Sequence, residues 1–307
     1  MSAESPFILA RARVGTVERL SPSFIRVTFS GPELADVGTP GHVLDQRIKL
    51  IFPGATEELP DLAAAGSDWY QAWLALPEAS RGSLRTYSIR ELVIDGASTH
   101  VIVDFVLHLD PGSSGPASRW ASAASYGDEI LLLGPRRGRS DGGGIEYSPG
   151  DAQTILLAGD ETAAPAIARI LEDADPDTRG VAFIEVPLGS DILPIVAPEG
   201  VEVRWLPRAE AAHGTSLLPA VLNYLGATAA IRIAELDTED LLWETPTYSG
   251  LGEDLSVPDN PRERYFWIAG ESGVVTTLRR HLVKDLGIDR SQVAFMGYWR
   301  KGVAMRG

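Results

Sequence analysis

Short runs in which apolar and polar residues alternate fill the first half of the chain, and a different pattern follows in the second half. The alternating runs are separated by Gly, Pro and Ser, which predicts strands joined by turns. The six predicted strands cover residues 11–19, 24–31, 46–52, 84–90, 100–107 and 128–133. Short strands at such irregular spacing predict an antiparallel β-barrel. Residues 53–82 interrupt the pattern, and only a short helix at 69–76 is predicted there.

The second half alternates short apolar runs with stretches in which apolar residues recur at helical spacing, as Ile167, Ile170 and Leu171 do. Predicted strands cover 154–159, 181–186, 201–206, 265–270 and 292–299. One predicted helix follows Thr162, and two more cover 215–225 and 272–287, the last of which ends at Gly287. Strands that alternate with helices predict a mainly parallel α/β sheet. The acidic stretch 236–263 receives no predicted structure.

The two patterns meet at a stretch rich in glycine and charge, RRGRSDGGGIEYSPGDA, at 136–152. This composition is typical of an exposed loop or a linker between domains. We therefore expect a β-barrel domain at 1–138, a linker at 139–152 and an α/β domain at 153–307. A chain of 307 residues is long enough for two domains of ordinary size.

Composition narrows the classes of function. The 27 Lys and Arg residues stand against 42 Asp and Glu residues, and the resulting charge of −15 repels nucleic acid and anionic membranes. The absence of cysteine excludes disulfides, cysteine-ligated iron–sulfur clusters and thiol catalysis. No run of apolar residues is long enough to span a membrane, and the histidines lack metal-ligand spacing. The pattern of residues 1–14 predicts no secretory signal. We expect a cytoplasmic monomer without a bound metal, which must borrow an organic cofactor for any redox chemistry.

The sequence RTYSIR at 85–90 places two arginines around a tyrosine and a serine in a predicted strand. Because a strand alternates its faces, Arg85 and Tyr87 share one face and Ser88 lies next to them. A flavin dinucleotide needs a cation for its pyrophosphate, an aromatic ring against its isoalloxazine and a hydrogen-bond partner near N5, and these residues can supply all three. The alternative interpretation of the same sequence is an edge strand with solvated arginines and a tyrosine that fills the barrel. Arg90 has the opposite parity and is expected to be a solvated strand end.

A second block, about twenty residues further along, predicts an anion site. A strand ends near His108, a Gly/Ser-rich turn follows, and a helix begins at Pro116, where a first-turn proline is favoured. N–H groups at a helix start attract anions, so residues 115–118 can hold the pyrophosphate that Arg85 neutralises. Asp104 and His108 share a strand parity and can face the ribityl or adenosine part. Alternatively, the His108 side chain bonds a backbone carbonyl, and the Asp104 side chain accepts from a backbone group, with no role in flavin binding.

Five blocks of the sequence resemble, in order and spacing, the siderophore-interacting protein family. These are FAD-containing ferric-siderophore reductases related to the ferredoxin–NADP reductases. The blocks are RTYSIR (85–90), DFVLH (104–108) with GPASRWA (115–121), LLAGDETAAPAIARIL (156–171), WIAGES (267–272) and GYWRKG (297–302). The resemblance implies flavin-dependent reduction of ferric siderophores with release of Fe(II). A general NAD(P)H-dependent flavin or quinone reductase and a non-catalytic siderophore-binding protein are the alternatives.

The resemblance also implies the residues of an FAD site, among which Tyr87 and Ser88 are the candidate catalytic residues. The implied site consists of Arg85, Thr86, Tyr87, Ser88, Asp104, Val106, His108, Gly115, Pro116, Ala117, Ser118 and Thr162. The C-terminal block, with Tyr298 and Trp299, is expected to return toward the flavin. The implied electron-donor site consists of Asp160, Glu161, Thr162 and Glu271.

The donor block is unusual for a dinucleotide site. Such loops are glycine-rich so that the backbone can approach phosphate, whereas AGDETAAP at 158–165 has one glycine followed by two carboxylates. NADH or NADPH could dock on the helix start, which Thr162 would cap, with Asp160 and Glu161 on ribose hydroxyls. Alternatively, the domain is degenerate and reduced ferredoxin supplies the electrons.

Two observations bear on the choice of donor. No arginine cluster follows the strand 181–186, and Glu185 at its end suits a ribose diol, which favours NADH over NADPH. The negative net charge of the chain disfavours the docking of an acidic ferredoxin, unless a basic patch of Arg136, Arg137 and Arg139 binds it.

Ferric siderophores are often anionic, so we expect cations around the site that receives them. Lys49 is the first candidate, because its strand is apolar on both sides and a lysine there either snorkels or is functional. Arg119, Arg300 and Lys301 are further candidates. The siderophore class is left open.

Overall fold

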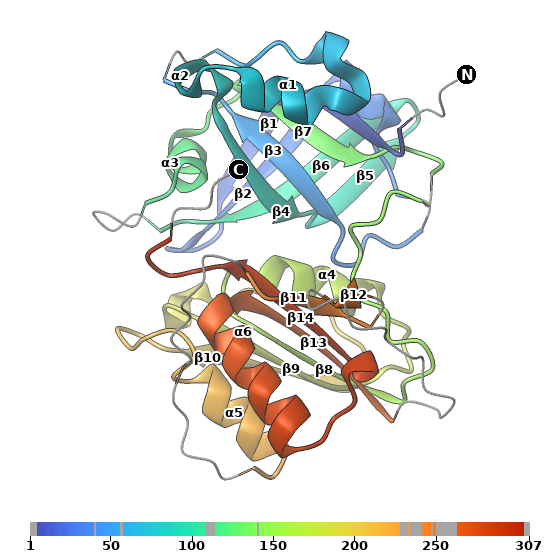
Figure 1. Ribbon diagram of the computed structural model, residues 1–307, viewed down its shortest axis with the longest axis vertical. Helices are drawn as coiled ribbons and strands as arrows, with labels where there is room; N and C mark the ends of the chain where they lie inside the picture. Colours follow the sequence, from blue (N-terminus) through green and yellow to red (C-terminus); the bar gives the residue numbers. More distant parts are fainter. Residues whose placement is uncertain are drawn as a thin grey trace. The chain divides into compact units, whose positions relative to one another are not determined.

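The computed structural model describes residues 5–39, 41–55, 58–108, 114–139, 141–227, 233, 241–246, 248–249 and 263–303. The chain forms two compact units, divided between Ile145 and Glu146 (Figure 1). The first contains a seven-stranded antiparallel sheet, and the second contains a seven-stranded, mainly parallel sheet with helices. The predicted fold class, a β-barrel followed by an α/β domain, is confirmed.

The sheet of the first unit has the strand order β4-β3-β7-β1-β2-β6-β5. Its strands are β1 Phe7–Arg19, β2 Phe24–Ser30, β3 Arg47–Phe52, β4 Ser83–Ser88, β5 Glu91–Asp95, β6 Ser98–Val106 and β7 Glu129–Pro135. Only β5 lies outside the predicted set. It is mostly exposed, so its sequence lacks the apolar alternation that marks a half-buried strand.

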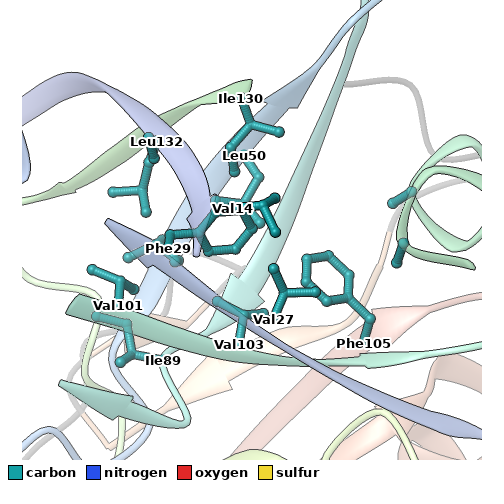
Figure 2. Close-up of a cluster of buried hydrophobic side chains, with 14 of the residues drawn as sticks. Val14, Val27, Phe29, Leu50, Ile89, Val101, Val103, Phe105, Ile130 and Leu132 are labelled. Atoms are coloured by element: carbon teal, nitrogen blue, oxygen red, sulfur yellow. The ribbon is translucent and has the colours of Figure 1, made fainter. Parts of the chain in front are cut away.

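One continuous segment closes this sheet. β4 pairs with β3 at one edge, and β5 pairs with β6 at the other. Between them, the Ile89 N–H donates to Gln46 O and the Arg90 N–H donates to Ile102 O, both at 2.9 Å. Consecutive residues therefore bridge the two edges, and the sheet curls around an apolar core (Figure 2). The labelled core residues are Val14, Val27, Phe29, Leu50, Ile89, Val101, Val103, Phe105, Ile130 and Leu132.

The stretch 53–82 covers part of the outer face of the barrel. It contains a 3₁₀ segment at Ala63–Asp68 and the helices α1 (Trp69–Ala75) and α2 (Glu78–Arg81), so the predicted helix at 69–76 is confirmed. Trp73 is buried, packs with an outer apolar cluster and donates its Nε1–H to Arg81 O at 2.7 Å. That cluster includes Leu84 of β4, so the side of β4 on which Leu84 lies points away from the barrel core. A further 3₁₀ segment spans Pro32–Asp36, and helix α3 spans Pro116–Ala123.

The sheet of the second unit has the order β10-β9-β8-β13-β14-β11-β12, in which the first five strands are parallel. The strands are β8 Thr154–Gly159, β9 Arg179–Val186, β10 Gly200–Pro207, β11 Trp243–Thr245, β12 Tyr248–Ser249, β13 Arg264–Glu271 and β14 Val293–Trp299. β11 and β12 lie in the stretch 236–263, most of which is outside the described residues.

The helices of the second unit are α4 (Ala164–Asp173), α5 (Leu217–Tyr224) and α6 (Ser272–Arg279), with 3₁₀ segments at Gly189–Asp191 and Arg290–Gln292. α5 and α6 pack on one face of the sheet, where they form an apolar cluster with β8, β9, β13 and β14 (Figure 1). The predicted helix 272–287 changes to π-helical bonding at Arg280–Asp285 and ends at Gly287, whose φ is +68°. Parallel pairing brings the carboxyl ends of five strands to one edge, where α/β proteins commonly bind ligands.

Gly180 in β9 is required by a close backbone approach. Its φ is +142°, and a Cβ there would lie 1.9 Å from Ile155 O. Gly180→Ala should lower the free energy of unfolding by more than about 2 kcal/mol, measured by urea unfolding with tryptophan fluorescence. Gly189→Ala is the control, because a Cβ there meets nothing within 4 Å. Equal unfolding midpoints for the two variants would contradict the assignment.

Candidate functional site

Arg85 and Tyr87 lie on the barrel-core side of β4. Tyr87 packs against the core cluster to which Ile89 belongs, whereas Leu84 belongs to the outer cluster, and alternation gives Arg85 the face of Tyr87. Burial lowers the pKa of Arg85, yet no carboxylate pairs with it among the described residues. Its Nη1 donates to Leu84 O at 2.7 Å. A partly buried guanidinium without a counter-ion is suited to an anionic ligand.

An aromatic cluster connects Tyr87 to helix α3. The Tyr87 ring lies 4.6 Å from Phe105 and 6.5 Å from Phe52, between ring centroids. Trp120 of α3 contacts the same two rings, at 5.0 Å from Phe52 and 6.0 Å from Phe105. Burial raises the pKa of Tyr87, and the positive charge of Arg85 opposes this rise only in part, so the phenol is neutral. The cluster therefore fixes the position of the Tyr87 ring and that of helix α3, which follows β6.

The start of α3 is tied to the end of β6 by Ser118. Its Oγ accepts the His108 N–H at 2.9 Å and donates to His108 O at 3.3 Å. Gly115 is the N-cap, no side chain caps the helix, and the Arg119 N–H donates to Gly115 O at 3.1 Å. The N–H groups of Ala117 and Ser118 precede that bond and point out of the helix start. The first turn, with Pro116 at its beginning, has the form of an anion site.

Lys49, Thr86 and Ser88 lie on the opposite face of the β3–β4 pair from Arg85 and Tyr87. Lys49 is the direct partner of Thr86, and its Nζ is 3.4 Å from Thr86 Oγ1. Burial and the charge of Arg47 lower the pKa of Lys49. The structure therefore separates the predicted residues into two groups on the two faces of one strand pair.

Asp104 takes part in an ion pair. It accepts from Nε and Nη2 of Arg26 at 2.7 and 2.8 Å, and Arg90 Nε lies 3.7 Å away. The expectation that Arg90 is a solvated strand end is wrong, since Arg90 is 9 % exposed. The bend from β4 to β5 places Arg90 beside β6, where its N–H donates to Ile102 O. The local sequence pattern does not predict this long-range contact. Val106, the last residue of β6, is partly buried.

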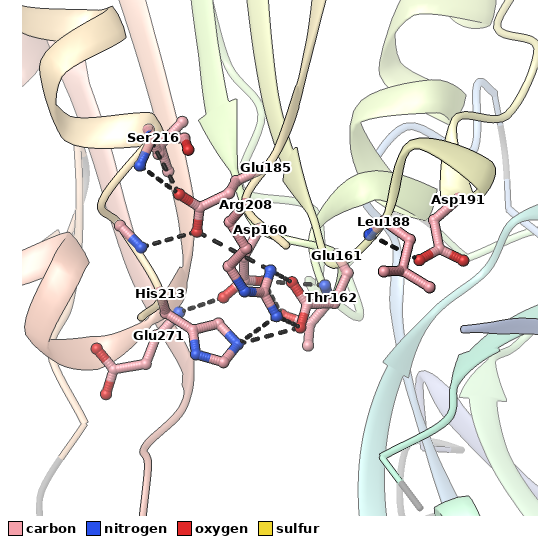
Figure 3. Close-up of polar contacts among 12 residues, drawn as sticks. Asp160, Glu161, Thr162, Glu185, Leu188, Asp191, Arg208, His213, Ser216 and Glu271 are labelled. Atoms are coloured by element: carbon pink, nitrogen blue, oxygen red, sulfur yellow. Dashed lines mark hydrogen bonds and ion pairs between the residues drawn. The ribbon is translucent and has the colours of Figure 1, made fainter. Parts of the chain in front are cut away.

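The predicted donor residues gather at the carboxyl edge of the second sheet (Figure 3). Asp160 follows β8, is 3 % exposed and accepts four hydrogen bonds. The donors are the N–H and Oγ1–H of Thr162 at 2.9 and 2.5 Å, the Glu271 N–H at 2.7 Å and the Trp299 Nε1–H at 2.9 Å. Burial and then the charge of Glu161 raise the pKa of Asp160 to about 6, and the hydrogen bonds from Thr162 and Trp299 oppose the rise.

Thr162 does not cap helix α4, so that expectation is wrong. The N-cap is Ala163, no side chain caps the helix, and the Thr162 hydroxyl donates to Asp160. The carbonyl of Asp160 accepts the N–H groups of Ala163 and Ala164. A buried carboxylate needs donors, and the hydroxyl is committed to it.

Glu161 is fully buried and forms a two-point ion pair with Arg208 at 2.7 and 2.8 Å. His213 Nε2 lies 3.1 Å from Glu161 and 2.8 Å from Arg208, and its ring meets Trp299 edge to face at 4.8 Å. Burial alone would raise the pKa of Glu161, but the hydrogen bonds from His213 and Arg208 and the charge of Arg208 outweigh it and lower the pKa to about 2. Sequence reasoning missed Arg208 and His213, because only the fold brings them to Glu161.

Glu185 and Glu271 bind helix starts. Glu185 is fully buried and accepts the N–H groups of Gly214, Ser216 and Leu217 at 2.7 to 3.0 Å, at the beginning of α5. The expectation that Glu185 suits a ribose diol is wrong, and with it the preference for NADH that rested on this residue is lost. Glu271 is the N-cap of α6 and accepts the Val274 N–H at 3.0 Å.

The remaining predicted cations are spread over both units. Arg119 is exposed and its side chain donates to Ser114 O. Arg300 and Lys301 follow β14, and the Lys301 N–H donates to Glu271 at 3.3 Å.

The predicted basic patch for ferredoxin is largely engaged within the first unit. Arg136 donates to Ser5 O, Arg137 to Thr99, and Arg139 pairs with Asp141 at 2.6 Å.

The described residues hold no group of three or more His, Asp or Glu side chains placed to bind a metal ion. None of the helices that they form is long and apolar enough to span a membrane.

Comparison with protein families assigns both halves of the chain. Residues 13–139 match the siderophore-interacting FAD-binding domain, and residues 152–302 match the siderophore-interacting protein model. The chain belongs to the siderophore-interacting protein family. The family resemblance expected from the five sequence blocks is thereby confirmed.

Similar proteins cover almost the whole chain. An uncharacterized protein of Mycobacterium tuberculosis is 32 % identical over 94 % of this chain and 89 % of its own length. The ferric vibriobactin reductase ViuB of Vibrio cholerae is 27 % identical over 92 % of this chain and 86 % of its own. The crystal structure of a siderophore utilization protein from T. fusca superposes with a TM-score of 0.70 at 28 % identity, and the match covers 99 % of this chain and 97 % of that one.

Glu161→Gln should lower the free energy of unfolding by about 3–5 kcal/mol, because it breaks the two-point ion pair of the buried Arg208, whose other carboxylate, Glu185, lies 4.0 Å away. The lowered pKa of Glu161 means that its ion pair stabilises the fold above pH 4.5, and this stability is lost as the pH falls toward about 2. The variant should therefore lose less stability than the wild type between about pH 4.5 and 3. Urea unfolding across this range measures both effects, with the exposed Glu199→Gln as control. Parallel pH profiles for Glu161→Gln and wild type would refute the ion-pair assignment.

Proposed function

We propose that the protein is an FAD-dependent oxidoreductase that reduces ferric siderophores and so releases Fe(II). The observation that carries the proposal is Arg85, a partly buried cation with no carboxylate partner among the described residues, in a domain of the FAD-binding family. Support for the acceptor comes from ViuB, a relative named as a ferric vibriobactin reductase.

The residues of the first unit fit an FAD molecule. Arg85 and the N–H groups at the start of α3 are suited to a pyrophosphate, and a Cβ on Gly115 would meet nothing within 4 Å, so the backbone there is open to a ligand. Tyr87 offers a neutral ring fixed by Phe105. When bound, FAD supplies a carrier that accepts electrons as a hydride pair and passes them on singly.

The remaining predicted FAD residues take supporting roles in this proposal. Ser118 holds the helix start against His108, and the Asp104 ion pair fixes β2 to β6 below it. Ser88 and Thr86 lie on the other face of β4, so a ligand that reaches them must pass the edge of the strand.

The acceptor site in this proposal uses the cations of the outer face. Lys49 has a pKa lowered by burial and by Arg47, and it has no carboxylate partner among the described residues. In a chain of charge −15, two neighbouring cations create a local positive potential that attracts an anionic chelate. The iron is cargo and needs no protein ligand. Arg119, Arg300 and Lys301 are further candidates.

We propose a nicotinamide nucleotide as the electron donor, with reduced ferredoxin as the alternative. Engagement of Arg136, Arg137 and Arg139 within their own unit weakens the case for a basic ferredoxin-docking patch. The burial of Glu185 removes one of the two observations that favoured NADH over NADPH, and only the lack of an arginine cluster after β9 remains.

The visible spectrum of the purified protein tests the cofactor, and a colourless protein that cannot be reconstituted with FAD would end the proposal. Anaerobic addition of NADH, NADPH or reduced ferredoxin then identifies the donor that bleaches the flavin. A ferrous-specific chelator traps the product. Fast turnover without any iron chelate would favour a general flavin or quinone reductase, and chelate binding without Fe(II) would favour a binding protein.

Arg85→Ala should weaken FAD binding by roughly ten- to hundredfold, because a charge-assisted phosphate contact contributes about 1.5–3 kcal/mol. The dissociation constant is measured by flavin fluorescence during titration of the apoprotein. The exposed Arg13→Ala in β1, which pairs with Glu129, is the control and should bind FAD normally. Unchanged affinity in Arg85→Ala would remove Arg85 from the FAD site.

Lys49→Ala should raise the half-saturating concentration of an anionic ferric chelate by about tenfold while flavin content stays unchanged. Steady-state reduction across a panel of catecholate, hydroxamate and carboxylate chelates measures the effect, with the exposed Lys284→Ala as control. Loss of flavin in Lys49→Ala would assign the lysine to the structure of the barrel instead.

A further inference from the structure

The carboxyl edge of the second sheet is the place where an α/β unit would bind a dinucleotide. In this chain that edge is filled by its own side chains, which come from the ends of all five parallel strands. We call this group the strand-end network, and it consists of Asp160, Glu161, Glu185, Arg208, Glu271 and Trp299. Figure 3 shows most of these side chains turned toward one another.

Several of the backbone donors that a pyrophosphate would need are already used. At the start of α4, the Thr162 N–H donates to the Asp160 carboxylate, and the next two N–H groups donate to its carbonyl. At the start of α5, three N–H groups donate to Glu185. At the start of α6, the Val274 N–H donates to Glu271. Each of the three helices that begin at this edge therefore has an acidic residue of the chain where an anionic ligand would bind.

The glycines at this edge also serve the protein rather than a phosphate. A Cβ on Gly159 would lie 2.4 Å from Ala163 Cβ, so this glycine lets α4 pack closely on β8. A Cβ on Gly270 would lie 2.7 Å from Asp160 Oδ2, so this glycine makes room for the buried carboxylate. The first turn of α4 is itself buried at Ala163 and Ala164.

Charge opposes a phosphate as well. The network carries four carboxylates and one guanidinium, and that guanidinium, Arg208, is bound to Glu161 at two points. The segment 186–200 that follows β9 contains no Lys or Arg. A pyrophosphate buried among these side chains would lie beside like charges, and the one guanidinium of the network is already bound.

The network holds the segment that follows β14 instead. Asp160 accepts the indole N–H of Trp299 at 2.9 Å, and Glu271 accepts the Lys301 N–H at 3.3 Å. Residues 299–301, which carry Arg300 and Lys301, are thus fixed to the ends of β8 and β13.

We propose that this edge binds the chain's own segment 299–301 in place of the adenosine diphosphate half of a nucleotide, so that a nicotinamide donor is recognised by its nicotinamide end alone. The part that concerns the donor rests on the proposed function. The part that concerns the edge does not, because it can be tested without flavin.

Calorimetric titration of the full-length protein with ADP-ribose tests the edge directly. The expected result is no saturable binding up to roughly millimolar concentrations. Saturable binding at lower concentrations would overturn the proposal whether or not the protein holds FAD or reduces iron.

Flavin reduction tests the donor. Reduced nicotinamide mononucleotide and NADH should bleach the flavin with second-order rate constants within about threefold of each other, because the adenosine half adds no transition-state binding. A rate constant for NADH more than about tenfold higher would overturn the proposal. A protein that holds FAD but is reduced by neither compound contradicts the nicotinamide donor and leaves the ADP-ribose titration to decide about the edge.

Limited trypsinolysis tests the anchor of segment 299–301. Asp160→Asn keeps the size of the side chain but loses an acceptor oxygen, and it should speed cleavage after Arg300 and Lys301 by about tenfold. The exposed Asp151→Asn is the matched control. Trp299→Phe, which removes the indole N–H donor together with part of the ring that meets His213, gives a second test if Asp160→Asn fails to fold. Equal cleavage rates in variants and wild type would refute the anchor.

Discussion

A buried carboxylate must find hydrogen-bond donors, and this requirement organises the second unit. Asp160, Glu161 and Glu185 lie at the ends of neighbouring parallel strands, where backbone N–H groups and side-chain donors of other segments meet them. Each carboxylate takes a different set: Asp160 binds the loop and Trp299, Glu161 binds Arg208, and Glu185 binds the start of α5. The acids cross-link this edge of the sheet. Residues that look like ligand contacts in the sequence are therefore part of the framework.

The first unit meets a different constraint, which is closure of the sheet. The segment from β4 to β5 must pair with both edges of the barrel, so its parity is set at both ends. This places Tyr87 among the core rings and Arg85 beside it, while Thr86 faces Lys49 on the outside. The same bend brings Arg90 to Asp104, which already pairs with Arg26. One run of the chain thus supplies a partly buried cation beside the core rings, a threonine that faces Lys49 on the outside, and an arginine of a structural ion pair.

Local pattern was sufficient for most of the fold because strands and helices differ in apolar period. It failed for β5, whose residues are largely exposed, and for the change to π-helical bonding at Arg280. The candidate site was recognisable where chemistry is local, as in the run from Arg85 to Ser88 or the turn before Pro116. It was misjudged where a partner is distant in sequence: Glu185 finds donors about thirty residues away, and Glu161 finds Arg208 only because β8 and β10 end at one edge. Parity, in contrast, was read correctly for Arg85 and Tyr87, since it needs no knowledge of partners.

The distribution of unpaired charge separates the two units further. In a chain with an excess of acids, several described arginines pair with a carboxylate, as Arg26, Arg208 and Arg279 do. Desolvation raises the free energy of a partly buried cation that has no carboxylate partner. The pKa values of Arg85 and Lys49 are lowered for this reason. An anionic ligand would relieve that penalty, whereas the second unit has already neutralised or hydrogen-bonded the charged groups at its strand ends. Among the described residues, the barrel therefore keeps partly buried cations without a carboxylate partner, whereas the strand ends of the α/β unit hold their own chain.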